Sequence, residues 1–436
     1  MPEWYVSGGM ALAAILVLMF LSVPVAFAFL LVSFGGMYLL SGFAGISQVI
    51  ANASVSVTHF VFLPIPLFLL MGELFFNTGV ARKVFDAVDV LIGRVRGRLS
   101  YVTIFGGTTF AALTGTSMGN TAMLGSLLVP EMTRRGYRKS MSIGPILGVG
   151  GLAILIPPSG LAVLLGSLAK IDIGRLLIAG VIPGLVLAGL YLVLIWVRIR
   201  LDRACVRSAR SASPGQVALK VIVVHILRSS IRGSSWSRPD ASGNRAGNRR
   251  SFGVLGVLIV AFFFGGLTRA SIWASLMGTV KVTGMLLLIV AASSTFSQVL
   301  AFSGATSGMI RTVGGFDLSP VVLIAVLFAI LLVMGMFMDQ ASIMMLTIPI
   351  FFPIAQAQGF DLVWFGIVML LALEMSGVTP PFGLNLFVML GVAPEGTTMG
   401  EVARAAVPYL ACGVLLFVLL VAVPDVALFL PSLMDR

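Results

Sequence analysis

After Glu3 the chain continues for 69 residues, 4–72, without any Asp, Glu, Lys or Arg. A membrane-spanning helix needs about 20 apolar residues, so this stretch alone holds two or three crossings. Similar uncharged stretches follow as far as the C-terminus, and only 10% of the 436 residues are charged. A soluble domain carries about 25% charged residues. The sequence therefore excludes a soluble fold and predicts an all-α polytopic membrane protein with about ten crossings.

The positive net charge of the chain comes from one segment. Residues 198–250 contain 12 Lys or Arg and 2 Asp, which accounts for +10 of the formal net charge of +12. The remainder of the chain is nearly balanced, so we expect no nucleic-acid surface. The two cysteines and two histidines are too few for a disulfide framework, a zinc cluster or a His-based triad. We therefore expect a protein that is not an enzyme.

The uncharged stretch Leu99–Pro130 is predicted to fold as a re-entrant helical hairpin. Its centre, 114–120, is rich in glycine and small hydroxyl residues, which are poor for a straight helix. Basic residues flank both ends, and Lys and Arg favour the cytoplasmic side, so both ends are expected to face the cytoplasm. The alternative is a pair of short ordinary helices with a packing seam of small residues.

A second unit repeats the first with an offset of 223 residues. The pairs are Pro130 and Pro353, Gly136 and Gly359, Pro157 and Pro380, Pro158 and Pro381, and Gly160 and Gly383. The first unit is flanked by basic residues, whereas no Lys or Arg occurs between Arg311 and Arg404. The positive-inside rule therefore predicts opposite orientations for the two units. Inverted repeats with broken helices are typical of secondary transporters, whose binding site lies between the repeats.

Each unit carries a pair of consecutive prolines inside an apolar stretch, Pro157-Pro158 and Pro380-Pro381. Proline leaves carbonyls of the preceding turn without donors, which indicates discontinuous helices lining a cavity. Such carbonyls suit a hard cation such as sodium. Neutral oxygen groups near the breaks complete the predicted ion or substrate site: Thr116, Ser117, Asn120, Ser159, Thr379 and Asn385. The alternative is a proline kink whose unpaired carbonyls are satisfied by neighbouring hydroxyl groups.

Two acidic residues of the second unit, Asp339 and Glu374, are of interest for the site. Asp339 follows the apolar run 334–338, and a carboxylate at the bilayer centre costs about 2.5–3.5 kcal/mol, so it is expected to face a site or a partner. We predict that sodium is bound by Asp339 together with Ser117 and Thr379. A helix cap at the hairpin turn is the other interpretation, and the two are compatible. Glu374, close to Pro380, is left open as a gating, ion-linked or interfacial residue.

Several motifs together resemble the large membrane subunit of TRAP (tripartite ATP-independent periplasmic) transporters over most of the chain. They are Pro66–Glu73, Thr114–Ser117 with Asn120, Pro130–Met132 through Gly136-Tyr137, Ile156–Ser159, Ala179–Gly184, Asp339 with Pro349 and Pro353, and Thr379–Asn385. The resemblance implies an ion-transporter-superfamily-like fold and a sodium-coupled importer of organic acids in the bacterial inner membrane, working by an elevator mechanism. It also implies two partners, a small four-helix membrane subunit and a periplasmic solute-binding protein. Sodium is the coupling ion, and no other cofactor is expected.

The family's ion and substrate residues lie at hairpin tips and broken helices. On this sequence they correspond to Thr116, Ser117, Asn120 and Ser159 in one half, and to Asp339, Thr379 and Asn385 in the other. The resemblance leaves the acid open among C4-dicarboxylates, sugar acids and keto acids. Membrane lipid is expected to surround the protein.

Five segments follow from these patterns: N-terminal spans and a connecting arm (1–98), a first repeat (99–197), an aberrant basic segment (198–250), middle spans (251–317), and a second repeat with the C-terminal span (318–436). In the family a span ending in Thr-Pro-Thr-Glu-Ala occupies the place of the basic segment. Its absence, and the abrupt change in composition, lead to the hypothesis of a compensated frameshift over 206–250, which in the cell would leave the protein inactive. A genuine basic cytoplasmic loop is the alternative.

Two other functions fit parts of the pattern. One is a different inverted-repeat carrier, such as an anion–sodium symporter or a cation antiporter, that works without a binding protein. The other is a membrane scaffold without a transport cycle, which would have no need of matched helix breaks.

Overall fold

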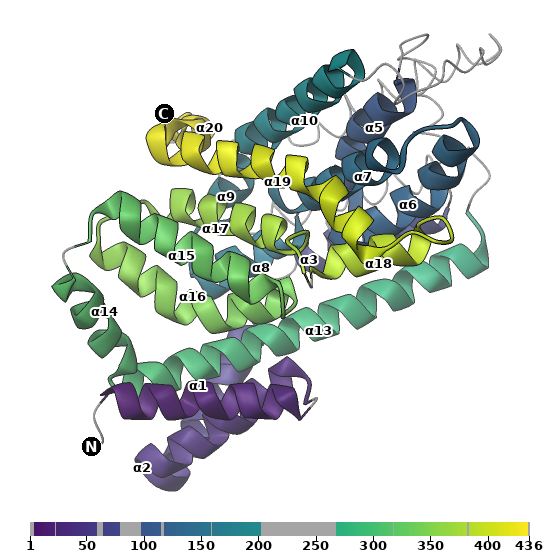
Figure 1. Ribbon diagram of the computed structural model, residues 1–436. Coiled ribbons are helices and arrows are strands. Elements are labelled where there is room, and N and C mark those ends of the chain that lie inside the picture. Colours follow the sequence, from purple (N-terminus) through teal and green to yellow (C-terminus); the bar gives the residue numbers. More distant parts are fainter. Residues whose placement is uncertain are drawn as a thin grey trace.

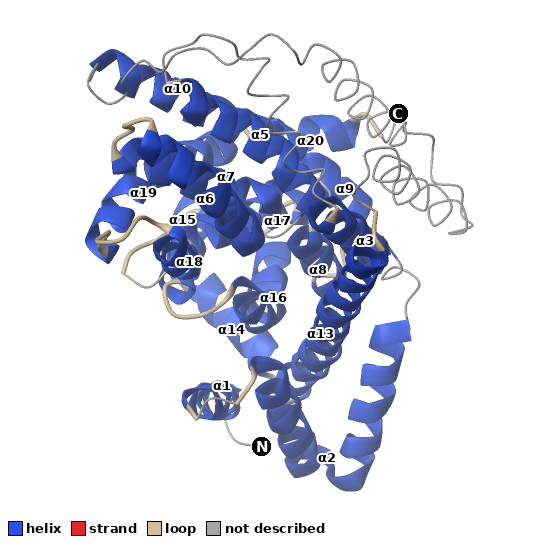
Figure 2. Ribbon diagram, turned by 90° about the vertical axis from the view of Figure 1, so that its right-hand side faces the viewer, coloured by secondary structure: helices blue, strands red, loops and turns tan. Residues whose placement is uncertain are grey.

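The computed structural model describes residues 4–21, 23–58, 64–78, 97–114, 117–157, 159–201, 267–316, 318–381 and 383–434. Over these ranges the chain forms helices joined by short loops, and no strand occurs among them (Figure 2). Thr116, Pro158 and the basic segment after Leu201 lie outside the described residues. The frameshift hypothesis therefore concerns a part of the chain that the structure does not describe.

Within the described residues, five helical stretches are long and apolar enough to cross a membrane, or up to six if one bent pair is counted as a single span. These five include α2 (Val25–Thr58), α10 (Val181–Leu201), α13 (Arg269–Phe302), α16 (Gln340–Ala357) and α19 (Met399–Ala422). Three shorter apolar helices are α1 (Trp4–Phe20), α15 (Pro320–Gly335) and α17 (Leu362–Ser376). The chain is a polytopic all-α membrane protein. Several uncharged stretches are divided by breaks into helices too short to cross alone.

The order of the first four helices of the first unit returns in the second. The first contains α5 (Arg98–Thr114), α6 (Ser117–Arg134), α7 (Lys139–Leu155), α8 (Gly160–Leu168), α9 (Ile173–Ala179) and α10. The second contains α15, α16, α17, α18 (Leu384–Val392), α19 and the terminal α20 (Asp425–Ser432). The starts of α6 and α16, and those of α7 and α17, are separated by the same 223 residues that separate the paired prolines.

The paired glycines close equivalent turns. Gly136 after α6 and Gly359 after α16 have φ angles of 74° and 75°, a left-handed conformation that glycine adopts without strain. The hydrogen bonds repeat as well: Tyr137 N donates to Met132 O and Phe360 N to Ala355 O, each at 3.0 Å. The repeat seen in the sequence is therefore a repeat of backbone structure.

The remaining helices lie along one side of the two units. In Figure 1, α13 runs beneath them, with α1 and α2 on its far side. The helices α2 and α3 (Pro64–Asn77) pack against α13, and α14 (Ala305–Gly315) follows it. Figure 2 shows α2 as two arms, because Gly42 has a φ angle of 60° inside it.

Two helices form the centre of the molecule. Every residue of α7 from Met141 to Leu155 is buried, and so is every residue of α17 from Trp364 to Ser376. Helices that are apolar on all sides pack in the interior. Because α7 and α17 touch and each ends at a break, both breaks begin at the buried end of a central helix.

Candidate functional site

The breaks after the two central helices are short and contain the paired prolines. The first separates α7 from α8 by residues 156–159, and the two helix axes differ by 43°. The second separates α17 from α18 by residues 377–383. Pro157 and Pro380 are half-buried, while Pro381 is exposed. The prediction of two discontinuous helices at matched positions is confirmed at the level of the backbone.

Carbonyl groups around the second break already have hydrogen-bond donors. The Thr379 hydroxyl donates to Met375 O at 2.7 Å, and the Ser376 hydroxyl donates to Leu373 O at 2.9 Å. The backbone N–H of Asn385 donates to Gly377 O at 2.9 Å. This is the hydroxyl-filled kink that the sequence left as an alternative. A carbonyl oxygen has two lone pairs. Leu373 O also accepts from Gln340 Nε2 and Met375 O from Val378 N, so of these three oxygens Gly377 O retains a lone pair for a cation.

A buried hydrogen bond joins the two repeats directly. Asn385 in the first turn of α18 donates through Nδ2 to the hydroxyl of Ser117, the first residue of α6, at 2.6 Å. The two residues are 268 positions apart, and their exposed fractions are 1% and 3%. The N-termini of α6 and α18 therefore meet in the interior, where the two N-terminal partial positive charges reinforce each other.

Two buried side-chain amides near this hydrogen bond, those of Asn120 and Asn385, have an oxygen without a partner. The Nδ2 group of Asn120 donates to Val149 O at 3.1 Å, which fixes the orientation of the amide because a carbonyl can only accept. Its Oδ1 has no hydrogen bond, and neither has Oδ1 of Asn385. Buried polar atoms are nearly always paired, so each unpaired oxygen is a place where a ligand would be stabilised.

Two predicted site residues cap helices. The carboxylate of Asp339 accepts hydrogen bonds from the backbone N–H groups of Ala341 and Ser342 at 3.1 and 3.2 Å, and also from the Ser342 hydroxyl. The hydroxyl of Ser159 accepts from Ala162 N at 3.2 Å and begins α8. The capping interpretation of Asp339 is therefore correct as geometry, and its carboxylate is held at the turn between α15 and α16.

The structure links some predicted residues and not others. No hydrogen bond in the described part of the chain joins Asp339, Ser117 and Thr379 to one another, so their shared sodium site stays a prediction. Gln340, which follows Asp339, does reach the break, because its Nε2 donates to Leu373 O at 2.9 Å. A Cβ added at Gly377 would lie 3.2 Å from Asn385 Nδ2 and 3.4 Å from Gln340 Nε2, so both amides face this glycine.

Sequence reasoning missed two polar residues of the site. Gln340 stands 223 positions after Ser117, so the repeat offset was available as an indication. Thr121 is fully buried, its hydroxyl has no hydrogen bond, and it packs where only the glycine at position 150 leaves room. Nothing in the local sequence distinguishes Thr121 from an ordinary helical threonine.

The arrangement combines neutral oxygen atoms, one carboxylate and converging helix N-termini. Neutral oxygens with a carboxylate suit a hard monovalent cation, and helix N-termini attract the carboxylate of an anionic solute. No cluster of three or more His, Cys, Asp or Glu residues occurs in the ranges that the structure describes. This set of groups suits the binding of a small cation together with an anion.

The family model and the similar proteins point to the same family. The model of the family "Tripartite ATP-independent periplasmic transporter, DctM component" matches residues 12–426. The C4-dicarboxylate TRAP transporter large permease protein DctM of Pseudomonas aeruginosa is 32% identical over 384 residues, covering 86% of this chain and 87% of that protein. The 2,3-diketo-L-gulonate TRAP transporter large permease protein YiaN of Escherichia coli is 27% identical, covering 93% and 94%.

Among solved structures, the YdaH transporter of Alcanivorax borkumensis has a similar fold, with a TM-score of 0.63. The similarity covers 90% of this chain and 89% of the YdaH chain at 12% sequence identity. The arrangement of helices is therefore shared with a transporter whose sequence has diverged widely.

Proposed function

Because the chain belongs to the family of the DctM component of TRAP transporters, as a large permease subunit of the bacterial inner membrane, we propose that it moves an organic acid inward, coupled to sodium. The family membership favours this function over a carrier without a binding protein and over a scaffold. Relatives in the family are named for a C4-dicarboxylate and for a diketo sugar acid, so the proposed substrate is a small carboxylate of this kind.

The observation that carries the proposal is the hydrogen bond between Ser117 and Asn385. It brings the polar ends of both repeats together inside the protein, beside the unpaired oxygen atoms of Asn120 and Asn385. Such oxygens would replace part of the hydration shell of a sodium ion. A solute carboxylate beside the ion would be stabilised by the N-termini of α6 and α18.

The proposed transport cycle is of the elevator type. The two broken helices and the hairpin helices next to them would move together across the membrane, carrying sodium and solute between them. The proposed partners are a small four-helix membrane subunit and a periplasmic solute-binding protein. The small subunit would bind the exposed apolar side of this chain, and the binding protein would deliver the acid. The large apolar side chains exposed on α2 and α13, among them Leu39 and Trp273, need lipid or protein around them.

The test is uptake into reconstituted vesicles that contain this chain, the small subunit and the binding protein. The ligand of the binding protein is identified first, because that protein sets much of the selectivity. We expect uptake of this ligand with an inward sodium gradient and none when choline replaces sodium. Uptake at the same rate without sodium would disprove the coupling. No uptake under either condition, also after the reading frame of residues 206–250 has been restored, would disprove the transport function.

A further inference from the structure

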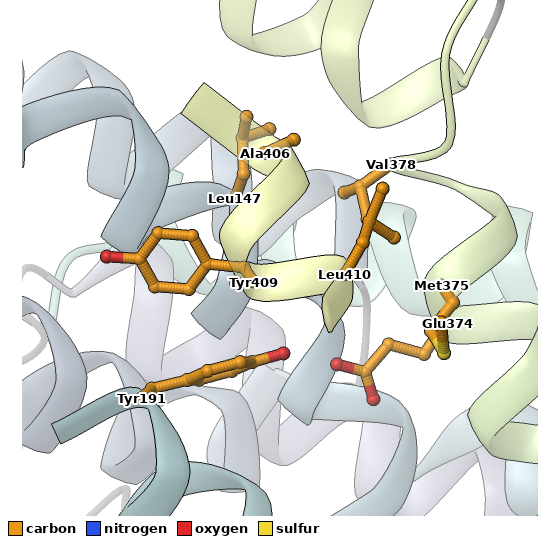
Figure 3. A pocket seen from close by; sticks show the side chains of 9 residues that line it. Leu147, Tyr191, Glu374, Met375, Val378, Ala406, Tyr409 and Leu410 are labelled. Atoms are coloured by element: carbon orange, nitrogen blue, oxygen red, sulfur yellow. The ribbon is translucent and has the colours of Figure 1, made fainter. Parts of the chain in front are cut away.

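A small cavity lies beside the second break, lined by residues other than the predicted ligands of the candidate cation site. Its volume is about 10 Å³, which is room for one water molecule. Four helices line it: α7, α10, α17 and α19. Most of the lining is apolar, and the polar exceptions are Glu374, Tyr191 and Tyr409 (Figure 3).

Glu374 is the acidic group of this cavity and has no role in the function proposed above. Its exposed fraction is 3%, and its Oε2 has no hydrogen-bond partner. The carboxyl group packs against Gly151 of α7, where an added Cβ would lie 2.6 Å from Glu374 Cδ. The ion pairs of the described residues involve Glu131 and Glu401, not Glu374.

The groups that face Glu374 from neighbouring helices carry no positive charge. From α10, the Tyr191 hydroxyl points toward the carboxyl group in Figure 3, whereas the Tyr409 hydroxyl of α19 points away. Two further titratable groups lie along the same two helices: Cys412, one turn after Tyr409 in α19, and Arg198 at the end of α10. From α7, the residues near Glu374 are Leu147 and two glycines. A carboxylate without a counter-charge is strongly disfavoured in such surroundings, and a neutral carboxylic acid is not.

The candidate cation site holds the backbone on both sides of Glu374. The preceding carbonyl, Leu373 O, accepts from Gln340 at 2.9 Å, and the following carbonyl, Met375 O, accepts from the Thr379 hydroxyl at 2.7 Å. Gln340 is adjacent to Asp339, and Thr379 is a predicted ligand. If sodium draws Thr379 or Gln340 toward itself, these bonds change and the last turn of α17 moves with them.

We propose that Glu374 and this cavity form a proton-binding site, which is occupied in this conformation and exchanges its proton when the cation site fills. On release, the O–H bond of the carboxylic acid breaks, the proton passes to a water molecule in the cavity, and the electron pair stays on the carboxylate. The Tyr191 hydroxyl is placed to donate to that carboxylate. The link to sodium rests on the proposed function, whereas the occupied proton site does not.

The first experiment is infrared spectroscopy of the full chain in lipid vesicles at neutral pH, without substrate. A buried neutral carboxylic acid gives a carbonyl stretch well separated from that of a carboxylate. We expect this band in the wild type and in Glu131→Gln, the control at a half-buried ion pair, and its loss in Glu374→Gln. Tyr191→Phe is expected to keep the band but shift its frequency. Identical spectra for the wild type and Glu374→Gln would overturn the proposal.

The second experiment adds sodium chloride or choline chloride to the same vesicles. We expect sodium alone to change the Glu374 band in the wild type, and we expect no response in Asp339→Asn. Calorimetry measures sodium binding in parallel. Sodium binding with an unchanged band would overturn the coupling to Glu374. Absence of sodium binding would instead refute the proposed sodium coupling, and the first experiment would still decide whether Glu374 holds a proton.

Discussion

Asn385 bonds to both sides of the site at once. Its backbone N–H pairs with Gly377 in its own repeat, and its side chain pairs with Ser117 in the other repeat. A buried polar side chain must find partners, and those partners define where it can sit. This single residue therefore fixes the distance between α18 and α6, and the oxygen of its side-chain amide, Oδ1, remains without a hydrogen bond.

We predict that Asn385→Ala weakens sodium activation of uptake by about tenfold, or about 1.4 kcal/mol. The substitution removes one oxygen near the site and leaves the Ser117 hydroxyl buried without its partner, which also destabilises the fold by about 1–3 kcal/mol. The measurements are the sodium concentration for half-maximal uptake and the thermal unfolding temperature in detergent.

Asn52→Ala is the matched control for that variant. Asn52 also makes one long-range hydrogen bond, to Ser294 O at 3.2 Å, but it joins α2 to α13. We expect its sodium dependence to equal that of the wild type. An equal effect of both substitutions would mean that Asn385 acts through general stability.

Asp339→Asn is predicted to abolish or weaken the sodium dependence of uptake. Asparagine caps helices about as well as aspartate, so α16 should keep its start while the negative charge is lost. Asp361→Asn is the control, because Asp361 caps α17 in the same way, accepting from Val363 N and Trp364 N. Sodium titration of uptake distinguishes them, and an unchanged dependence in Asp339→Asn would remove that residue from the site.

At the scale of the elements, the 223-residue repeat governs where helices begin and end. The glycines at equivalent turns illustrate the cause, since Gly136 and Gly359 take a left-handed backbone that lets the next helix reverse. The breaks follow the same rule, because prolines interrupt both central helices at equivalent positions.

Gly359→Ala is predicted to lower stability by about 1 kcal/mol, since a Cβ is strained at its φ angle of 75° although no atom lies within 4 Å of the added carbon. Gly189→Ala is the opposite case. Gly189 lies inside α10 with open space around it, so alanine should raise stability by about 0.5–1 kcal/mol. Thermal unfolding of the two variants in the same detergent checks the signs, and a shift of both in one direction would contradict this reasoning.

At the scale of the whole molecule, the key expectation is that the two repeats are inserted in opposite directions. Arg134 and Ala357 end α6 and α16 at equivalent positions, and both are exposed. After replacement of Cys205 and Cys412 by serine, single cysteines at these two positions should react with a membrane-impermeant reagent from opposite faces. Reaction of both from the same face would rule out the inverted arrangement.

The basic segment gives a prediction about the gene. Translation of the DNA for residues 206–250 in the two other reading frames should yield an apolar span with a Thr-Pro-Thr-Glu-Ala-like end. Restoring that frame should then raise uptake in vesicles, because one missing crossing returns. If neither frame encodes an apolar stretch, the segment is a genuine loop.

Much of the fold could be predicted because its causes are local. Apolar runs, paired prolines and turn glycines act within a few residues, so the sequence indicates the spans, the breaks and the repeat without knowledge of distant contacts. The uncharged stretch Leu99–Pro130 illustrates this, since its central glycine and hydroxyl residues predict an interruption and the structure has two helices there, α5 and α6. The expected number of about ten crossings stays a prediction, because the five or six candidate spans are counted over the described residues alone.

The sequence by itself determined that this chain is a membrane protein, that it is built from two related halves, and which helices are interrupted. Only the tertiary structure decided that Asn385 meets Ser117, that Gln340 supports the break, and that Glu374 faces a cavity instead of lipid or water. The physical reason is that hydropathy and backbone propensity depend on neighbours along the chain. Pairing of buried polar atoms depends instead on which distant helices pack together.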